Sequence, residues 1–102
     1  MTRLGFGLAL LLAAIIGPHA AAQDIGRGRE LATRWCSGCH VVDRATVKAP
    51  ADAVPAFPSL VRRTDDQLRA AMNPLHGKMP DLSLSKVQQD DLVAYIKSLA
   101  TN

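Results

Sequence analysis

The stretch Cys36-Ser37-Gly38-Cys39-His40 places the strongest constraint on how this chain can fold. It holds both cysteines of the chain, and a histidine follows the second directly. On a helix, side chains three residues apart lie on the same face, so both thiols can bond to one porphyrin. The spacing C-x-x-C-H is typical of covalent c-type haem attachment. We therefore predict that Cys36 and Cys39 hold one haem c and that His40 binds its iron.

Two other kinds of site can use the same residues. A thioredoxin-like dithiol has this cysteine spacing but lies in a βαβ unit, and the sequence shows no strand-like alternation. A zinc ion takes four ligands in a tetrahedron. Cys39 and His40 are adjacent and converge poorly on one ion, and His19 or His76 would have to complete the set. Haem attachment is the interpretation that the pattern favours.

The first 22 residues have the pattern of an export signal. Arg3 supplies a positive charge, and an apolar run of 14 residues follows it at 4–17. Such a run has the length of a signal-peptide core and is short for a membrane span. Pro18 ends the run, and three alanines at 20–22 offer a cleavage site. We expect residues 1–22 to be a signal peptide and residues 23–102 to form one periplasmic domain, and an uncleaved anchor is the alternative.

The domain that would remain after cleavage has little material for a core. Residues 23–102 contain 11 Lys and Arg against 9 Asp and Glu, a net charge near +2, which is too weak to indicate nucleic-acid binding. They contain one Trp, one Tyr and one Phe. Small domains of this kind usually depend on a disulfide, a metal or a large cofactor. A disulfide between Cys36 and Cys39 would close a very small loop, so a buried haem is the better source of apolar mass.

A first helix is predicted from Asp24, a suitable N-cap, to the cysteines. Apolar and small residues recur there at helical spacing, which indicates one buried face. This face comprises Gly28, Leu31, Ala32, Trp35, Cys36 and Cys39. Gly28 lies in the middle of the face, where glycine costs about 1 kcal/mol relative to alanine. A close approach by another helix would explain it.

Two more helices are predicted further along the chain. A capping box of Thr64 and Gln67 starts the second. The pair Asn73-Pro74 ends it. A box of Ser85 and Gln88 starts the last helix. Its apolar face comprises Val87, Leu92, Tyr95, Ile96 and Leu99, with Asp90, Asp91 and Lys97 on the solvent side. The expected loops lie at 41–58 and 75–84, with one helical turn at 59–63.

An iron held by one histidine has a sixth position to fill. A methionine thioether there raises the reduction potential and suits electron transfer. Met72 lies on the apolar face of the second predicted helix and is interpreted as a core residue. Met79 lies in a loop that Pro80 stiffens, and we favour it as the axial ligand, with His76 as its competitor.

The proximal histidine also needs a hydrogen-bond partner. A ligating histidine normally donates its other N–H to a carbonyl or carboxylate. A proline carbonyl in the first loop is a good candidate because proline fixes the local chain direction. Pro50, Pro55 and Pro58 compete, and the sequence leaves the choice open.

At these residues the sequence resembles the class I c-type cytochromes, of the small bacterial periplasmic kind with one haem. The similarity extends from Gly28 to Leu99 and is carried by residues 28–32, 36–40, 55–58, 76–80 and 91–96. The resemblance implies an all-α cytochrome c fold, with three to four helices around one covalently bound haem c. It also implies that the first and last helices cross near perpendicular.

The resemblance assigns roles to individual residues. Gly28 matches the small residue at the helix crossing, and Tyr95 matches its aromatic partner. Pro55 resembles the proline whose carbonyl accepts the N–H of the axial histidine, and Met79 matches the axial methionine. Many relatives carry an aromatic residue where this chain has Ala32, which leaves the details of helix packing open.

Two functions from different classes are compatible with such a site. The first is a periplasmic electron carrier, free or as the cytochrome subunit of an oxidoreductase, with no catalytic residue of its own. It would be a monomer or a small subunit, would bind neither membrane nor nucleic acid, and would dock redox proteins with acidic surfaces. The candidate docking residues are Arg34, Arg44, Lys48 and Lys78. The second is a ligand-binding or catalytic haem protein, which needs an open sixth position; Met79 argues against it.

Overall fold

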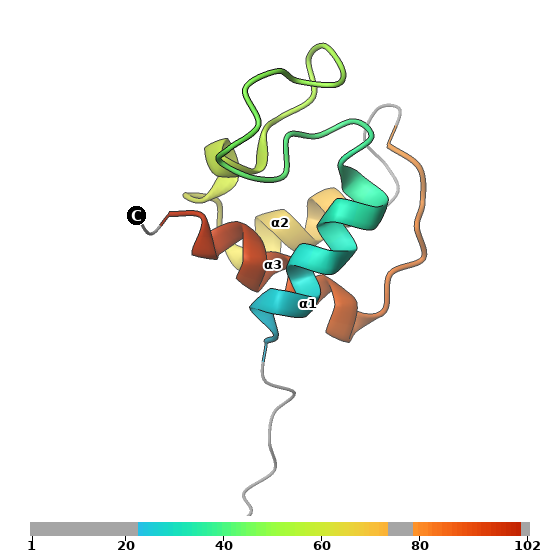
Figure 1. Ribbon diagram of the computed structural model, residues 1–102. Helices are drawn as coiled ribbons and strands as arrows, with labels where there is room; N and C mark the ends of the chain where they lie inside the picture. Colours follow the sequence, from blue (N-terminus) through green and yellow to red (C-terminus); the bar gives the residue numbers. More distant parts are fainter. Residues whose placement is uncertain (1–22, 74–78, 101–102) are drawn as a thin grey trace, which may run out of the picture.

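The computed structural model describes residues 23–73 and 79–100, and in these ranges the chain forms helices and loops without a strand. The elements are α1 (Ile25–Leu31), the π-helical turn η1 (Ala32–Cys36), the 3₁₀ helix η2 (Phe57–Leu60), α2 (Asp65–Met72) and α3 (Lys86–Ser98). Helix α3 packs against both α1 and α2 (Figure 1). This arrangement confirms the all-α prediction. The predicted signal peptide, residues 1–22, lies outside the described residues.

Each α-helix begins after the capping residue that the sequence predicts. The Asp24 carboxylate accepts the N–H of Arg27 at 3.0 Å. Thr64 opens α2 and Ser85 opens α3, each in a complete capping box with the glutamine three residues on. These bonds satisfy N–H groups that the start of a helix leaves without partners. Local chemistry therefore sets the helix boundaries.

Gly28 is the point where α1 and α3 meet. A Cβ atom built on Gly28 would lie 2.1 Å from the carbonyl oxygen of Asp91 and 2.7 Å from Cβ of Tyr95. Only glycine allows the two helices to come this close. Ala32, one turn further on, has no exposed surface, so a small side chain fills this buried position. The predicted close approach of two helices at Gly28 is confirmed.

The core joins the crossing to the first loop and to α2. It comprises Ala32, Cys36, Val42, Phe57, Leu68, Leu92, Val93, Tyr95 and Ile96. The Tyr95 hydroxyl donates to the carbonyl of Val42 at 2.6 Å, and burial raises the pKa of this phenol. This buried bond ties the start of the first loop to α3.

Asp91 does not lie on the solvent side, so that prediction is wrong. Its side chain is buried, and a carboxylate oxygen accepts the backbone N–H of Asp24 at 2.8 Å. Asp24 is the N-cap of α1, where N–H groups lack partners inside the helix and the helix dipole favours negative charge. These two effects offset the cost of burying a carboxylate. Asp90 is partly buried and accepts two bonds from Arg69.

Three residues predicted to lie on buried faces are exposed: Trp35 at 55%, Val87 at 44%, and Cys39. In η1 the N–H of Ser37 donates to the carbonyl of Ala32, five residues back, at 3.0 Å. This wider turn rotates the residues that follow, so Cys36 and not Trp35 reaches the buried face. Val87 lies in the first turn of α3, before the segment that crosses α1.

The short helical turn lies earlier than predicted. It spans Phe57–Leu60 instead of 59–63, and so the first loop is two residues shorter. Pro58 lies near the start of η2, where the fixed backbone angle of proline favours helix initiation. In the described part of the chain, no helix is long and apolar enough to cross a membrane.

Candidate haem-binding site

The C-x-x-C-H motif begins at the last residue of η1 and continues as a tight turn. The backbone N–H groups of Cys39 and His40 both donate to the carbonyl of Cys36, at 3.1 and 2.8 Å. This turn brings Cys36, Cys39 and His40 to the wall of one cavity. Both cysteines are free thiols; Cys36 is buried and Cys39 is exposed.

Burial raises the pKa of the Cys36 thiol to about 11. In the chain without a cofactor, this thiol is therefore neutral at pH 7. A redox dithiol and a zinc site both act through thiolates, which this environment disfavours. Within the described residues, no three His, Cys, Asp or Glu side chains are grouped to hold a metal ion. Neither alternative interpretation of the motif gains support here.

The imidazole of His40 is fixed by the first loop. Its Nδ1 lies 2.6 Å from the carbonyl oxygen of Pro55. A carbonyl oxygen can only accept, so Nδ1 carries the proton and Nε2 keeps its lone pair. The ring also packs against Phe57, with ring centroids 5.2 Å apart and planes tilted by 48°. Of the three candidate prolines, the one that meets His40 is therefore Pro55.

Two cavities of about 290 and 300 Å³ lie around this histidine. Both are lined by Cys36, His40, Pro55 and Met79. The inner cavity is further lined by apolar side chains of the core and α2, among them Phe57, Leu60, Leu68, Leu92 and Ile96. The outer cavity is further lined by Trp35, Gly38, Cys39, Ala53, Val54, Pro80 and Leu82. Cofactor pockets commonly have volumes of about 300–1,000 Å³.

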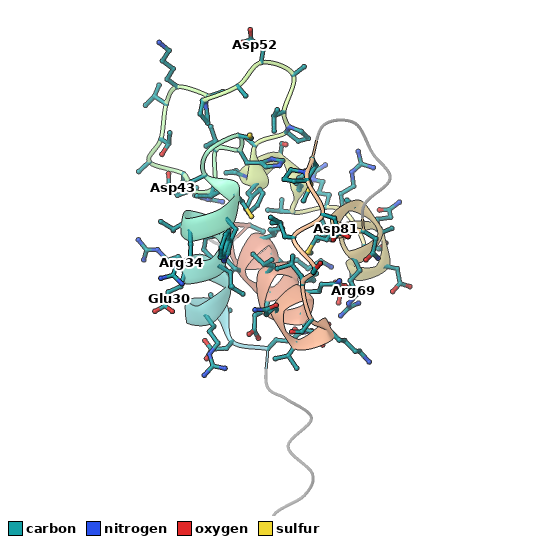
Figure 2. All side chains as sticks on the ribbon, turned by 90° about the vertical axis from the view of Figure 1, so that its right-hand side faces the viewer. Glu30, Arg34, Asp43, Asp52, Arg69 and Asp81 are labelled. Atoms are coloured by element: carbon teal, nitrogen blue, oxygen red, sulfur yellow. The ribbon has the colours of Figure 1, made fainter. Side chains whose placement is uncertain are left out.

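None of the six charged residues labelled in Figure 2 lines either cavity. Glu30 and Arg34 project outward from α1, and Asp52 lies at the outer bend of the first loop. The segment 79–84 runs beside α1 toward the start of α3 (Figure 1). The crevice formed by the two cavities thus lies between this segment and the first loop, and most of its lining is apolar.

The two methionines in the described residues lie in different surroundings. Met79 is half-buried and lines both cavities. Met72, on α2, lines only the inner cavity, and it packs against the core. His76, the competing ligand predicted from the sequence, lies outside the described residues.

Both loops of the crevice hold a non-glycine residue in the left-handed region. Ala53 has φ 61° and Ser83 has φ 50°. Such a conformation costs on the order of 1–3 kcal/mol and occurs often at binding sites. Ala53 lines the outer cavity. The N–H of Ser83 donates to the Asp81 carboxylate at 2.8 Å, a local turn that supports this segment.

Sequence analysis missed two polar residues of the inner cavity. Arg63 and Gln67 line it beside the apolar side chains. Gln67 was identified only as a capping partner of α2. Arg63 lies in the turn after η2, where no periodic pattern distinguishes a cavity-facing side chain from a solvated one.

These residues fit a covalently bound haem, because two free thiols, an oriented imidazole and a thioether line one apolar crevice. A three-helix fold that carries such a crevice defines a small c-type cytochrome. The chain is 43% identical to cytochrome c-552 of Bradyrhizobium diazoefficiens over 97 residues, which cover 91% of this chain and 92% of that protein. The chain therefore belongs to the small c-type cytochromes, electron-transfer proteins with covalently bound haem c. No family model and no solved structure matches it.

Proposed function

We propose that this cytochrome carries electrons in the periplasm through one haem, which Cys36 and Cys39 hold covalently and which His40 and Met79 bind at the two axial positions. One observation carries the proposal. His40 donates from Nδ1 to Pro55 at 2.6 Å, and its ring lines the two cavities that Met79 also lines. An outer hydrogen bond of this kind fixes the tautomer of a ligating histidine and makes its other nitrogen a stronger donor.

When bound, the haem supplies a one-electron change between ferric and ferrous iron. The chain sets the conditions for that change. The soft sulfur of Met79 favours the ferrous state and raises the reduction potential. The apolar side chains of the inner cavity exclude water and oppose the additional positive charge of the ferric state. No side chain has to act as acid, base or nucleophile, so the proposal assigns no catalytic residue.

Met79 is preferred to Met72 because of their different positions. Met79 lines both cavities together with His40, and Pro80 limits the motion of the segment that carries Met79. Met72 fills space between α2 and the core. A methionine in that position is explained by packing alone.

The proposal includes export by a cleaved signal peptide, residues 1–22, and a mature haem domain of residues 23–102. The protein would act as a free carrier or as the cytochrome subunit of an oxidoreductase, and its partners would be redox proteins with acidic surfaces. Arg34 and Lys48 are exposed and suit this role. Arg44 donates to the carbonyl of Leu99, so it also has a structural role. Lys78 lies outside the described residues.

Visible spectroscopy of two methionine variants tests the axial ligand. Met79→Ala should abolish the ferric sulfur-to-iron charge-transfer band, lower the reduction potential and let the ferrous protein bind carbon monoxide. Met72→Leu conserves volume and should cost less than about 1.5 kcal/mol of stability, with the band intact. This second variant controls for damage to the core.

Loss of the band in Met72→Leu, with the band kept in Met79→Ala, would reverse the roles of the two methionines. If neither variant changed the spectrum, His76 would become the leading ligand. If the unaltered ferrous protein bound carbon monoxide readily at neutral pH, the sixth position would be open, and a ligand-binding haem protein would replace the electron carrier.

A further inference from the structure

We propose that the Arg63 end of the inner cavity binds the haem propionates, with Gln67 as a second donor; this inference rests on the proposed haem attachment at Cys36 and Cys39. A haem has two propionate groups, on pyrroles other than the two that form the thioethers. The part of the crevice away from the thioethers must therefore accommodate two carboxylates. Apolar surroundings would make an unpaired carboxylate there costly.

The two cavities place Arg63 away from the exposed end of the attachment motif. Cys39 lines only the outer cavity, whereas Arg63 and Gln67 line only the inner cavity. Cys36 and His40 lie on the wall that both cavities share. Arg63 and Gln67 thus share no cavity wall with Cys39.

The charges in the crevice favour a carboxylate ligand. Among the described residues that line the two cavities, Arg63 is the only one with a permanently charged side chain, and none is Asp or Glu. No carboxylate in the described ranges forms an ion pair with Arg63, whereas Arg69 pairs with Asp90 and Lys97 with Asp65. The guanidinium fork matches a carboxylate with two parallel hydrogen bonds.

The local backbone holds both donors in place. The N–H of Arg63 donates to the carbonyl of Leu60 at 3.0 Å, which fixes the residue at the end of η2. The side-chain oxygen of Gln67 accepts the N–H of Thr64 at 3.0 Å in the capping box of α2. That bond uses only the amide oxygen, so the NH₂ group of the same side chain can donate to a carboxylate.

A positive charge beside the propionates has an electrochemical effect. It offsets their negative charge, which otherwise stabilises the ferric state. Replacement of Arg63 by a neutral residue should therefore lower the reduction potential. Replacement of Arg62, which lines neither cavity, should have little effect, because its charge does not lie at the wall that would hold the propionates.

Three variants of the holoprotein test the assignment. Arg63→Gln removes the charge, Arg63→Lys keeps the charge but not the fork, and Arg62→Gln is the control, because both arginines are exposed but Arg62 lines neither cavity. The measurements are the reduction potential at low ionic strength and the propionate bending band in the resonance Raman spectrum. We expect a lower potential and a shifted band for Arg63→Gln, a potential near wild type with a shifted band for Arg63→Lys, and neither change for Arg62→Gln.

The assignment fails if the propionate band of both Arg63 variants matches that of wild type. It also fails if the two glutamine variants lower the potential equally. Where Arg63→Gln gives too little holoprotein, Arg63→Lys alone decides, through the Raman band. The proposed function fails in a different way: in-gel staining of the denatured wild-type protein would then detect no covalent haem.

Discussion

The α1–α3 crossing and the haem crevice lie side by side, yet they are held together by different means. At the crossing, backbone and side-chain atoms of α3 occupy all the space beside Gly28, down to 2.1 Å from where a Cβ would lie. At the crevice, two cavities separate α2 from the loops, and both loops contain a residue in the left-handed region. The crossing is completed by the chain's own residues, whereas the crevice is completed by its cofactor.

This difference shows how so small a domain acquires a core. Below about 70–80 residues, a single apolar core seldom supplies enough stability by itself. Here the aromatic content is low, and the side chains that line the inner cavity face space that no other side chain fills. A covalently bound haem supplies the missing contacts, because its apolar surface is removed from water when the chain folds around it.

The largest expected effect follows from removal of the cofactor. Cys36→Ala with Cys39→Ala should leave no haem on the protein after denaturing electrophoresis. Without the haem, amide hydrogens of η2 and α2 should lose their protection against exchange before those of α1 and α3, because α1 and α3 also pack closely on each other at Gly28. Hydrogen-exchange mass spectrometry measures this order. Equal protection of α2 with and without haem would mean that the crevice packs without its cofactor.

A smaller effect is expected from a change confined to the crossing. Gly28→Val should destabilise the holoprotein by about 1–3 kcal/mol through overpacking, because the new side chain meets the Asp91 backbone and Tyr95. Gly26→Val is the matched control in the same helix, since a Cβ there has only the Asp24 carboxylate nearby, at 3.4 Å. Denaturant midpoints compare the two. Equal shifts would remove the close contact as the reason for glycine at position 28.

The smallest expected effect concerns the link between the two regions. Tyr95→Phe removes the buried bond to the carbonyl of Val42 and should cost about 0.5–1.5 kcal/mol. The visible spectrum should stay that of the wild type, since Tyr95 lines neither cavity. A stability within experimental error of the wild type would show that this bond does not hold the first loop to α3.

The sequence predicted the helix starts and the crossing well because both depend on nearby residues. Capping by Asp24, Thr64 and Ser85 needs partners only three residues away. Gly28 indicated a close contact because a glycine at a buried helical position needs a steric reason. Pro55 as the partner of His40 came from the family resemblance, since local reasoning left three prolines open.

The errors arose where distant parts of the chain meet. The sequence pattern predicts Asp91 on the solvent side, because its partner, the N–H of Asp24, lies 67 positions away in the chain. The pattern predicts a buried Trp35 because it assumes 3.6 residues per turn. The prediction fails because the π-helical turn η1 has more residues per turn. Arg63 gave no signal because a turn has no period from which to infer direction. The ligand role of Met79 stays a prediction until a spectrum tests it.

The most direct test of the proposed haem site is mass spectrometry of a tryptic digest of the denatured holoprotein. Trypsin cleaves after Arg34 and Arg44, which releases residues 35–44 with the whole motif on one peptide. We predict that this peptide carries the mass of one haem, joined through both cysteines. A haem that separates on denaturation, with residues 35–44 recovered as an unmodified peptide, would contradict attachment at Cys36 and Cys39 and the crevice built around it.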